Sequence, residues 1–109
     1  MNKKQFKANE KYLSNNGVSI SDEPVWENEP YSRELSFSSN AGGDLYICVE
    51  ELTREKVLER LSDFDVNEET ILWWGTDGSR VPFESIKDLY DDIDNWRTEF
   101  IEIAENIPF

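Results

Sequence analysis

The spacing of apolar residues predicts a long amphipathic helix near the C-terminal end of the sequence. No Gly or Pro interrupts residues 83–107, and apolar side chains recur there three, four or seven positions apart: Phe83, Ile86, Tyr90, Ile93, Phe100, Ile103 and Ile107. This spacing places them on one face of a helix, with Trp96 near its edge as a further core residue. Pro82 suits the first turn of such a helix, and Pro108 ends it. The opposite face is polar and mostly acidic: Glu84, Asp88, Asp91, Asn95, Glu99, Glu102 and Glu105.

Two patterns earlier in the sequence predict a hairpin followed by a shorter helix. Residues 33–38 alternate between polar and apolar, with Leu35 and Phe37 facing inward, whereas residues 45–49 are apolar throughout. A turn signal at residues 40–43 joins them, so we expect a β-hairpin whose second strand is the central one. Residues 53–63 then predict a helix, with Thr53 as its N-cap and apolar residues at helical spacing.

The remaining segments predict small elements and connections. Residues 3–13 form a short polar helix that ends at a turn over 15–17, and residues 18–31 form a loop with a short edge strand. An acidic loop at 63–69 precedes a strand at 70–74, a turn at Asp77-Gly78 and a short strand near 80–81. We therefore expect one α+β domain over residues 1–109, with residues 1–17 as a short basic N-terminal helix and turn. In it, a small antiparallel sheet of hairpins is packed by the middle helix and the long C-terminal amphipathic helix.

Charge is the strongest compositional signal. The 24 acidic residues outnumber the 11 basic ones, which gives a formal net charge of −13. Residues 1–13 hold four lysines against Glu10, a local charge of +3, so residues 14–109 together carry −16. Such a chain repels nucleic acid and anionic membranes and attracts basic partners. Aromatic residues make up 13% of the sequence, which favours a folded domain over an acidic disordered chain.

The residue types that most often perform catalysis are missing. The sequence has no His, and Cys48 is its only cysteine, so Ser-His and Cys-His nucleophile pairs and thiolate metal sites are excluded. We therefore expect a protein that is not an enzyme and that needs no cofactor. We interpret Cys48 as a buried structural residue, because its strand is the most apolar one.

Carboxylates are the remaining candidates for catalysis or metal binding. Asp88, Asp91, Asp92 and Asp94 cluster on the long helix, where we expect a solvated face on which nothing raises a pKa. Residues 63–67 match the first half of an EF-hand loop, but Glu68 stands where Gly is required and Trp74 where the bidentate Glu belongs. We expect no metal site there.

Several observations bear on the cellular compartment. The lysines at the start of the sequence are followed by Asn9, Glu10 and Lys11 and not by an apolar run, so a signal peptide is not expected. No stretch approaches the roughly 18 apolar residues of a membrane span. We expect the protein to be made and kept in the cytoplasm.

Aromatic residues among acidic ones are the candidates for partner binding. Trp26 lies in a loop flanked by prolines and acids, where it either contacts a basic protein surface or holds the loop to the core. The Trp73-Trp74 pair would point one indole inward and one outward, and the sequence does not decide which. We select Trp26, Glu27, Glu29, Asp91, Asp92 and Asp94 as the predicted partner-contact residues.

Three functions fit these features: two are inhibitory and the third is not. The first is an immunity protein or antitoxin that neutralises a basic toxin, such as a nuclease, by charge-complementary binding around an aromatic residue. The alternative is a nucleic-acid mimic of the anti-restriction or anti-defence type, whose acidic helix face imitates phosphates. A small adaptor domain is the third. In each case we expect a protein partner, with no direct contact to nucleic acid or membrane.

Overall fold

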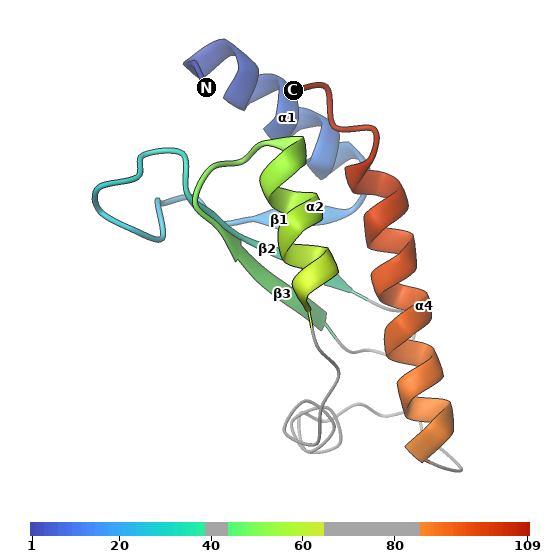
Figure 1. Cartoon of the computed structure of the whole chain (residues 1–109). Helices are drawn as coiled ribbons and strands as arrows, with labels where there is room; N and C mark the ends of the chain where they lie inside the picture. The colour runs from blue at the N-terminus through green and yellow to red at the C-terminus, as the bar shows by residue number, and fades with distance from the viewer. Residues whose placement is uncertain (39–43, 65–85) are drawn as a thin grey trace.

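The computed structural model describes residues 1–38, 44–64 and 86–109, and for residues 86–90 it describes the backbone only. In these ranges the order of elements is α1 (Lys3–Asn15), β1 (Val18–Ile20), β2 (Arg33–Ser38), β3 (Asp44–Val49), α2 (Arg54–Asp63) and α4 (Ile86–Ala104). Figure 1 shows the helices gathered around a small sheet. The predicted α+β class, with an antiparallel sheet packed by helices, is confirmed.

Helix α1 confirms the predicted N-terminal helix and its turn. Asn2 caps it: the Asn2 side chain accepts from the Gln5 backbone N–H, and the Gln5 side chain accepts from the Asn2 backbone N–H. Gly17 ends the segment with a φ of +85°, a conformation that costs glycine little. Phe6 and Leu13 are buried on one side of the helix, and the four lysines are exposed on the other: Lys3, Lys4, Lys7 and Lys11.

The sheet has three described strands in the order β1-β2-β3, all antiparallel. The register pairs Ile20 with Leu35 and Leu35 with Ile47, which places apolar side chains on one face. The alternation predicted for residues 33–38 is confirmed, since Leu35 and Phe37 are buried. The other face presents short polar side chains and Tyr46 to the outside.

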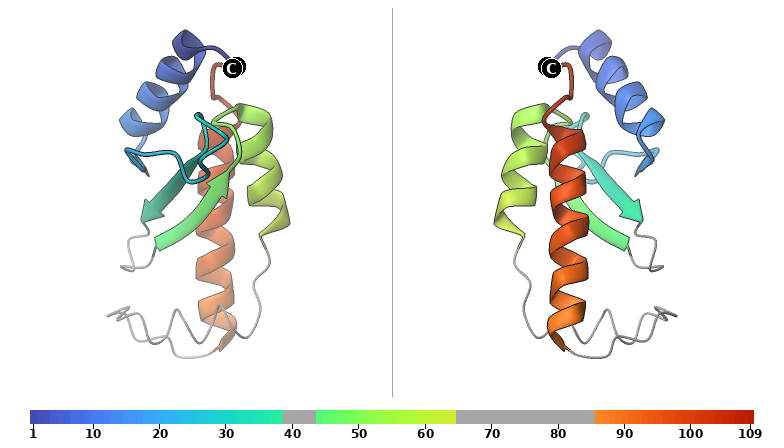
Figure 2. Two further views of the ribbon diagram at one scale, coloured as in Figure 1. Left: turned by 90° about the vertical axis from the view of Figure 1, so that its left-hand side faces the viewer. Right: turned by 90° about the vertical axis from the view of Figure 1, so that its right-hand side faces the viewer.

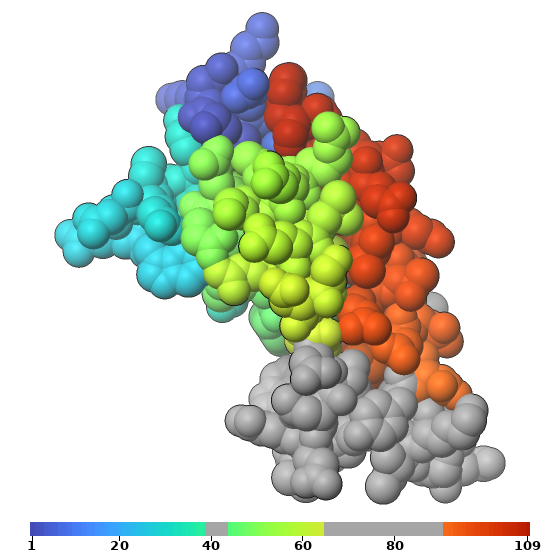
Figure 3. Space-filling view, in the orientation of Figure 1, coloured from blue at the N-terminus to red at the C-terminus, as the bar shows by residue number. Residues whose placement is uncertain are grey.

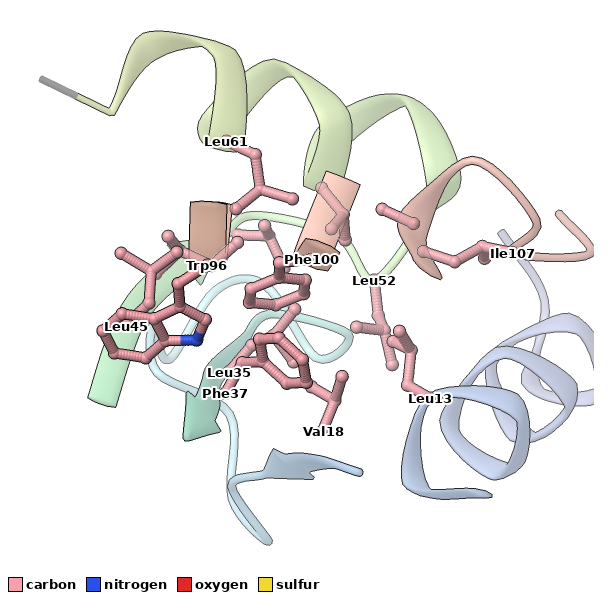
Figure 4. Close-up of a cluster of buried hydrophobic side chains, with 14 of the residues drawn as sticks. Leu13, Val18, Leu35, Phe37, Leu45, Leu52, Leu61, Trp96, Phe100 and Ile107 are labelled. Atoms are coloured by element: carbon pink, nitrogen blue, oxygen red, sulfur yellow. The ribbon is translucent and has the colours of Figure 1, made fainter. Parts of the chain in front are cut away.

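Helices α2 and α4 cover the apolar face of the sheet (Figure 2). Helix α2 begins at its predicted N-cap, where the Thr53 side chain accepts from the Lys56 backbone N–H. Figure 4 shows Phe100 and Trp96 of α4 lying against side chains of the sheet, and the rings of Phe37 and Phe100 are 5.1 Å apart. Trp96 is buried, as predicted. The core is thus formed where α2 and α4 meet the sheet, and Phe6 and Leu13 of α1 are buried in the same cluster.

The structure corrects two predictions about elements. Among the described strands β2 lies in the middle, whereas the apolar run at 45–49 had predicted that the second hairpin strand is central. That run misleads because Tyr46 and Cys48 face away from the core, so β3 buries only one of its faces. Helix α4 ends at Ala104, before the predicted end at Ile107, and Ile107 is buried in the short segment that follows.

A buried polar side chain joins three segments that are distant in the sequence. Asn9 on α1 is fully buried and donates to the backbone oxygens of Leu52 (2.9 Å) and Phe109 (3.2 Å). Its own side-chain oxygen accepts from the Phe109 backbone N–H at 3.1 Å. Because these bonds connect α1 with the linker before α2 and with the segment after α4, Asn9 fixes their relative positions. Figure 1 shows both ends of the chain near α1.

Several predictions lie outside the described residues. These are the strands at 70–74 and near 80–81, the turns at 40–43 and Asp77-Gly78, most of the acidic loop at 63–69, the orientation of Trp73 and Trp74, and the start of the long helix at Phe83.

Candidate functional site

The candidate site is a tight turn formed by residues 25–29, here called the Trp26 turn. The backbone N–H of Glu29 donates to the Trp26 oxygen at 3.0 Å and closes the turn. Ser32, which is fully buried, holds it from below: its hydroxyl accepts from the Trp26 N–H at 3.0 Å and donates to the Glu29 oxygen at 2.6 Å. The turn therefore has a defined conformation in the free protein.

Arg33 attaches the base of this loop to helix α1. The residue is 8% exposed, and its guanidinium donates to the oxygens of Pro30 (2.9 Å) and Ser32 (2.6 Å) and lies 4.6 Å from the centre of the Phe6 ring. The Phe6 ring in turn contacts the Tyr31 ring at 5.1 Å. Two backbone oxygens and the Phe6 ring face this buried charge, its Nε has no hydrogen-bond partner among the described residues, and no carboxylate in the same ranges pairs with it.

The Trp26 turn projects from the body of the molecule, as the space-filling view shows for the loop after β1 (Figure 3). Trp26 is 39% exposed and is not part of the buried core. The indole is therefore partly accessible to a partner, while its covered part lies beside the hollow that Ile47 and Phe64 also line. Val25 is equally exposed beside it, and Glu27 lies on the same turn.

A hollow of about 270 Å³ lies beside Trp26. Its lining comes from the loop, from strand β3 and from the end of helix α2: Trp26, Ile47, Cys48, Arg60, Asp63 and Phe64. Arg60 forms an ion pair with Glu50. In the described ranges no hydrogen bond or ion pair involves the Asp63 carboxylate, which is exposed. The structure thus places one unpaired carboxylate next to two aromatic residues.

Cys48 is not the buried structural residue that the sequence predicted. It lies on the outer face of β3, is partly exposed and places its Sγ 3.9 Å from a carboxylate oxygen of Glu34. Partial burial raises the pKa of the Cys48 thiol, and the negative charge of Glu34 raises it further. The thiol is therefore accessible but held in its less reactive, protonated form.

The predicted acids on α4 form a separate surface. Figures 1 and 2 place the loop before β2 and helix α4 on opposite sides of the molecule, so the structure does not bring Trp26, Glu27 and Glu29 together with Asp91, Asp92 and Asp94. Asp91 and Asp94 are exposed, and Asp94 pairs with Arg97 at 2.8 Å. The predicted contact residues therefore belong to two distinct surfaces.

Asp92 departs from the solvated face that the sequence predicted. One of its carboxylate oxygens is buried and has no hydrogen-bond partner in the described part of the chain. This desolvation raises the pKa of Asp92, because burial disfavours the charged form. The expectation that nothing raises a pKa on this helix is therefore wrong for Asp92.

Sequence reasoning missed the residues that complete the Trp26 surface. Arg33 is the first residue of β2, and Ser32 directly precedes it. No pattern of neighbouring residues in the sequence indicates that these two polar side chains are buried. Arg60 and Asp63 follow the exposed side of α2, three residues apart, which indicates only a solvated helix face. Their proximity to Trp26 depends on the packing of α2 beside β3, which no short-range pattern encodes.

The described residues contain no group of three or more Cys, Asp or Glu placed to hold a metal ion. In the same ranges no helix has the length and apolarity needed to cross a membrane.

Comparison with protein family models, with curated proteins and with solved structures finds no match to this chain.

Proposed function

We propose that this protein is an inhibitory binding protein that neutralises a basic protein, as an immunity protein or antitoxin neutralises a toxin such as a nuclease. The observation that supports this most is the Trp26 turn. It presents a large, half-exposed aromatic side chain on a conformation that is fixed before binding. Interface hot spots are rich in Trp, and a preorganised loop loses less conformational entropy on association.

The charge around the turn supports a basic partner. Residues 22–29 contain four acids and no base: Asp22, Glu23, Glu27 and Glu29. The nearest cation in sequence, Arg33, is buried beneath the loop and does not reach its surface. An approaching basic protein therefore meets carboxylates around one indole, an arrangement that accelerates association and fixes orientation.

The proposal assigns no catalytic role to the chain. A mechanism based on carboxylates needs two of them facing one substrate, commonly with a raised pKa on the acid. Burial raises the pKa of Asp92, whereas Asp91 and Asp94 beside it are exposed on the helix surface and do not form a cleft with it. The sequence also lacks His, the most frequent general base.

Nucleic-acid mimicry is the second candidate, and helix α4 is the observation that favours it. Its outer side exposes a row of acids over the described part, Asp91, Asp94, Glu99 and Glu102, and Glu105 follows directly after the helix. Rows of carboxylates on a rigid helix can occupy the phosphate sites of a DNA-binding enzyme. This candidate predicts that many acids on α4 contribute weakly, whereas the first predicts that Trp26 and its neighbours dominate.

Two variants with equal charge change separate these candidates. Glu27→Gln with Glu29→Gln removes two charges from the Trp26 turn, and Glu99→Gln with Glu102→Gln removes two from α4. The immobilised protein, each double variant and Trp26→Ala are incubated with lysate of the source cell at low and at high salt. Retained proteins are identified by mass spectrometry. A retained toxin, produced alone, is then tested for growth inhibition and for rescue by this protein.

The first function predicts one basic protein that stays bound at high salt, is lost with Trp26→Ala and is kept by the α4 variant. Retention at high salt follows because a desolvated aromatic contact is not screened by ions. Many DNA-binding proteins that dissociate as salt rises, and that bind the α4 variant less, indicate the mimic. Retention of no basic protein in either condition refutes both.

A further inference from the structure

We propose that the hollow beside Trp26 receives an arginine side chain of the basic partner. The inference deepens the proposed function, on which it rests, by naming the group that the Trp26 surface recognises. It depends on three properties of the hollow: its size, its unpaired charge and its aromatic lining.

The size of the hollow suits one side chain. Its volume of about 270 Å³ lies below the roughly 300–1,000 Å³ of pockets that bind small-molecule ligands. It opens at the surface between the loop, β3 and the end of α2, next to the exposed Trp26 turn. A side chain projecting from a docked protein therefore reaches it without any rearrangement of the described residues.

The charge of the hollow suits a cation. Arg60 is the one basic residue in its lining, and the ion pair with Glu50 neutralises it. Asp63 has no such partner in the described ranges, so its carboxylate remains available. Cys48 belongs to the lining, and the carboxylate of Glu34, which lies outside it, is 3.9 Å from the Cys48 thiol. Glu34 therefore adds a second negative charge near the hollow. A cationic group is thus favoured over a neutral or anionic one.

The aromatic lining favours arginine over lysine. Trp26 and Phe64 both border the hollow, and a guanidinium stacks on aromatic faces while its N–H groups bind a carboxylate. Guanidinium is also less strongly hydrated than ammonium, so it enters a partly apolar hollow at a smaller desolvation cost. The protein already contains a guanidinium over an aromatic ring, since Arg33 lies 4.6 Å from the centre of the Phe6 ring.

Cys48 provides a probe of this hollow that needs no partner. It is the only cysteine of the sequence, and its partly exposed thiol belongs to the lining. The intact protein is treated with a cationic methanethiosulfonate carrying a trimethylammonium group, and separately with neutral methyl methanethiosulfonate. The ratio of the two modification rates reports the preference of the hollow for a cation, because the fraction of thiolate cancels.

Asp63→Asn is expected to lower this ratio about fivefold, the effect of one charge at about 4 Å in water. Trp26→Ala is expected to lower it about two- to fivefold through loss of the cation–π contact, and Trp26→Phe to restore part of it. The matched control is Glu102→Gln, which removes one charge from the distant α4 and leaves the ratio nearly unchanged. Equal effects of Asp63→Asn and Glu102→Gln overturn the inference, since the preference is then a property of the whole charge.

A competition experiment tests the choice of arginine. N-acetyl-arginine amide at about 10 mM is expected to slow modification by the neutral reagent about twofold, as for a site with a Kd of about 10 mM. The neutral isostere N-acetyl-citrulline amide is expected to have no effect, and the lysine compound a smaller one. Equal protection by arginine and citrulline, or none by arginine, overturns the inference. Because these results require no partner, their failure is distinct from failure of the capture experiment, which refutes the function itself.

Discussion

Replacement of Asn9 by Ala is predicted to cost about 2–4 kcal/mol of folding free energy. Asn9 is completely buried, and its amide makes three hydrogen bonds, to the Leu52 oxygen and to both backbone groups of Phe109. The substitution leaves the buried Leu52 oxygen without this bond and removes one bond from each backbone group of the partly buried Phe109. The change removes the hydrogen bonds that join α1 to the linker before α2 and to the segment after α4, whose bonded residues lie 43 and 100 positions away in sequence.

The magnitude follows from counting the groups left without a partner. The Phe109 oxygen retains a second bond, from the Arg54 backbone N–H at 2.8 Å, so its loss is small. The Leu52 oxygen and the Phe109 N–H keep no such alternative among the bonds of the described residues. Leaving the buried Leu52 oxygen unsatisfied costs about 1–3 kcal/mol, and loss of the bond to the partly buried Phe109 N–H adds about 1 kcal/mol, which together give the range above. Total stabilities are about 5–15 kcal/mol, so the loss is readily measured.

Urea unfolding followed by circular dichroism provides the test. Asn15→Ala, at an exposed position of the same helix, is the control and is expected to change stability by less than about 0.5 kcal/mol. Asn9→Asp preserves the shape of the side chain but places a carboxylate near two backbone oxygens. The folded-state pKa of that Asp is then raised, so the variant is least destabilised at acid pH and loses stability as pH rises. A loss below about 1 kcal/mol for Asn9→Ala refutes the reasoning.

Three further predictions concern other described residues. Asp92→Asn is expected to raise stability at neutral pH by less than about 1 kcal/mol, since the rest of the carboxylate is solvated. Burial raises the Asp92 pKa in the folded state, so the charged carboxylate destabilises the fold at neutral pH. The gain therefore disappears in acid, where Asp92 of the unsubstituted protein is protonated in both states. Glu34→Gln is expected to lower the Cys48 pKa and to accelerate alkylation of Cys48 by iodoacetamide near pH 8. Glu102→Gln is the control and is expected to change neither. An unchanged pH–rate profile for Glu34→Gln contradicts the role of Glu34 in raising the Cys48 pKa. Phe100→Ala, which empties the centre of the core against Phe37, is expected to cost about 3–5 kcal/mol in urea unfolding, and a cost below 1 kcal/mol contradicts that packing.

The elements set by local chemistry were predictable from the sequence. Thr53 caps α2 because its hydroxyl accepts a backbone N–H three residues later, a relation visible as a residue type at a spacing. Leu35 and Phe37 alternate with polar residues because one face of their strand is buried. Strand β3 was misjudged because an apolar run looks the same whether both faces are covered or one is, and Tyr46 and Cys48 face outward here.

The candidate site was only partly predictable. Trp26 and its neighbouring acids stood out as an aromatic residue in an acidic loop, and the structure places them on a projecting turn. Asp63 did not stand out, because an acid at the end of a helix is ordinary and its proximity to Trp26 arises from packing between distant segments. Asn9 in the core was equally unpredictable. A polar residue on a lysine-rich helix is expected to be solvated, and the backbone groups that bind Asn9 belong to residues far away in the sequence.

The lysines on the outer side of α1 give the molecule an electrical polarity. They are gathered on one helix, while the acids of the Trp26 turn and of α4 occupy other parts of the surface, so the centres of positive and negative charge do not coincide. Such a molecule has a permanent dipole moment, and the field of a basic protein exerts a torque on it before contact. The torque turns α1 away from the basic protein, so that fewer collisions begin at the lysine-rich helix than random tumbling gives.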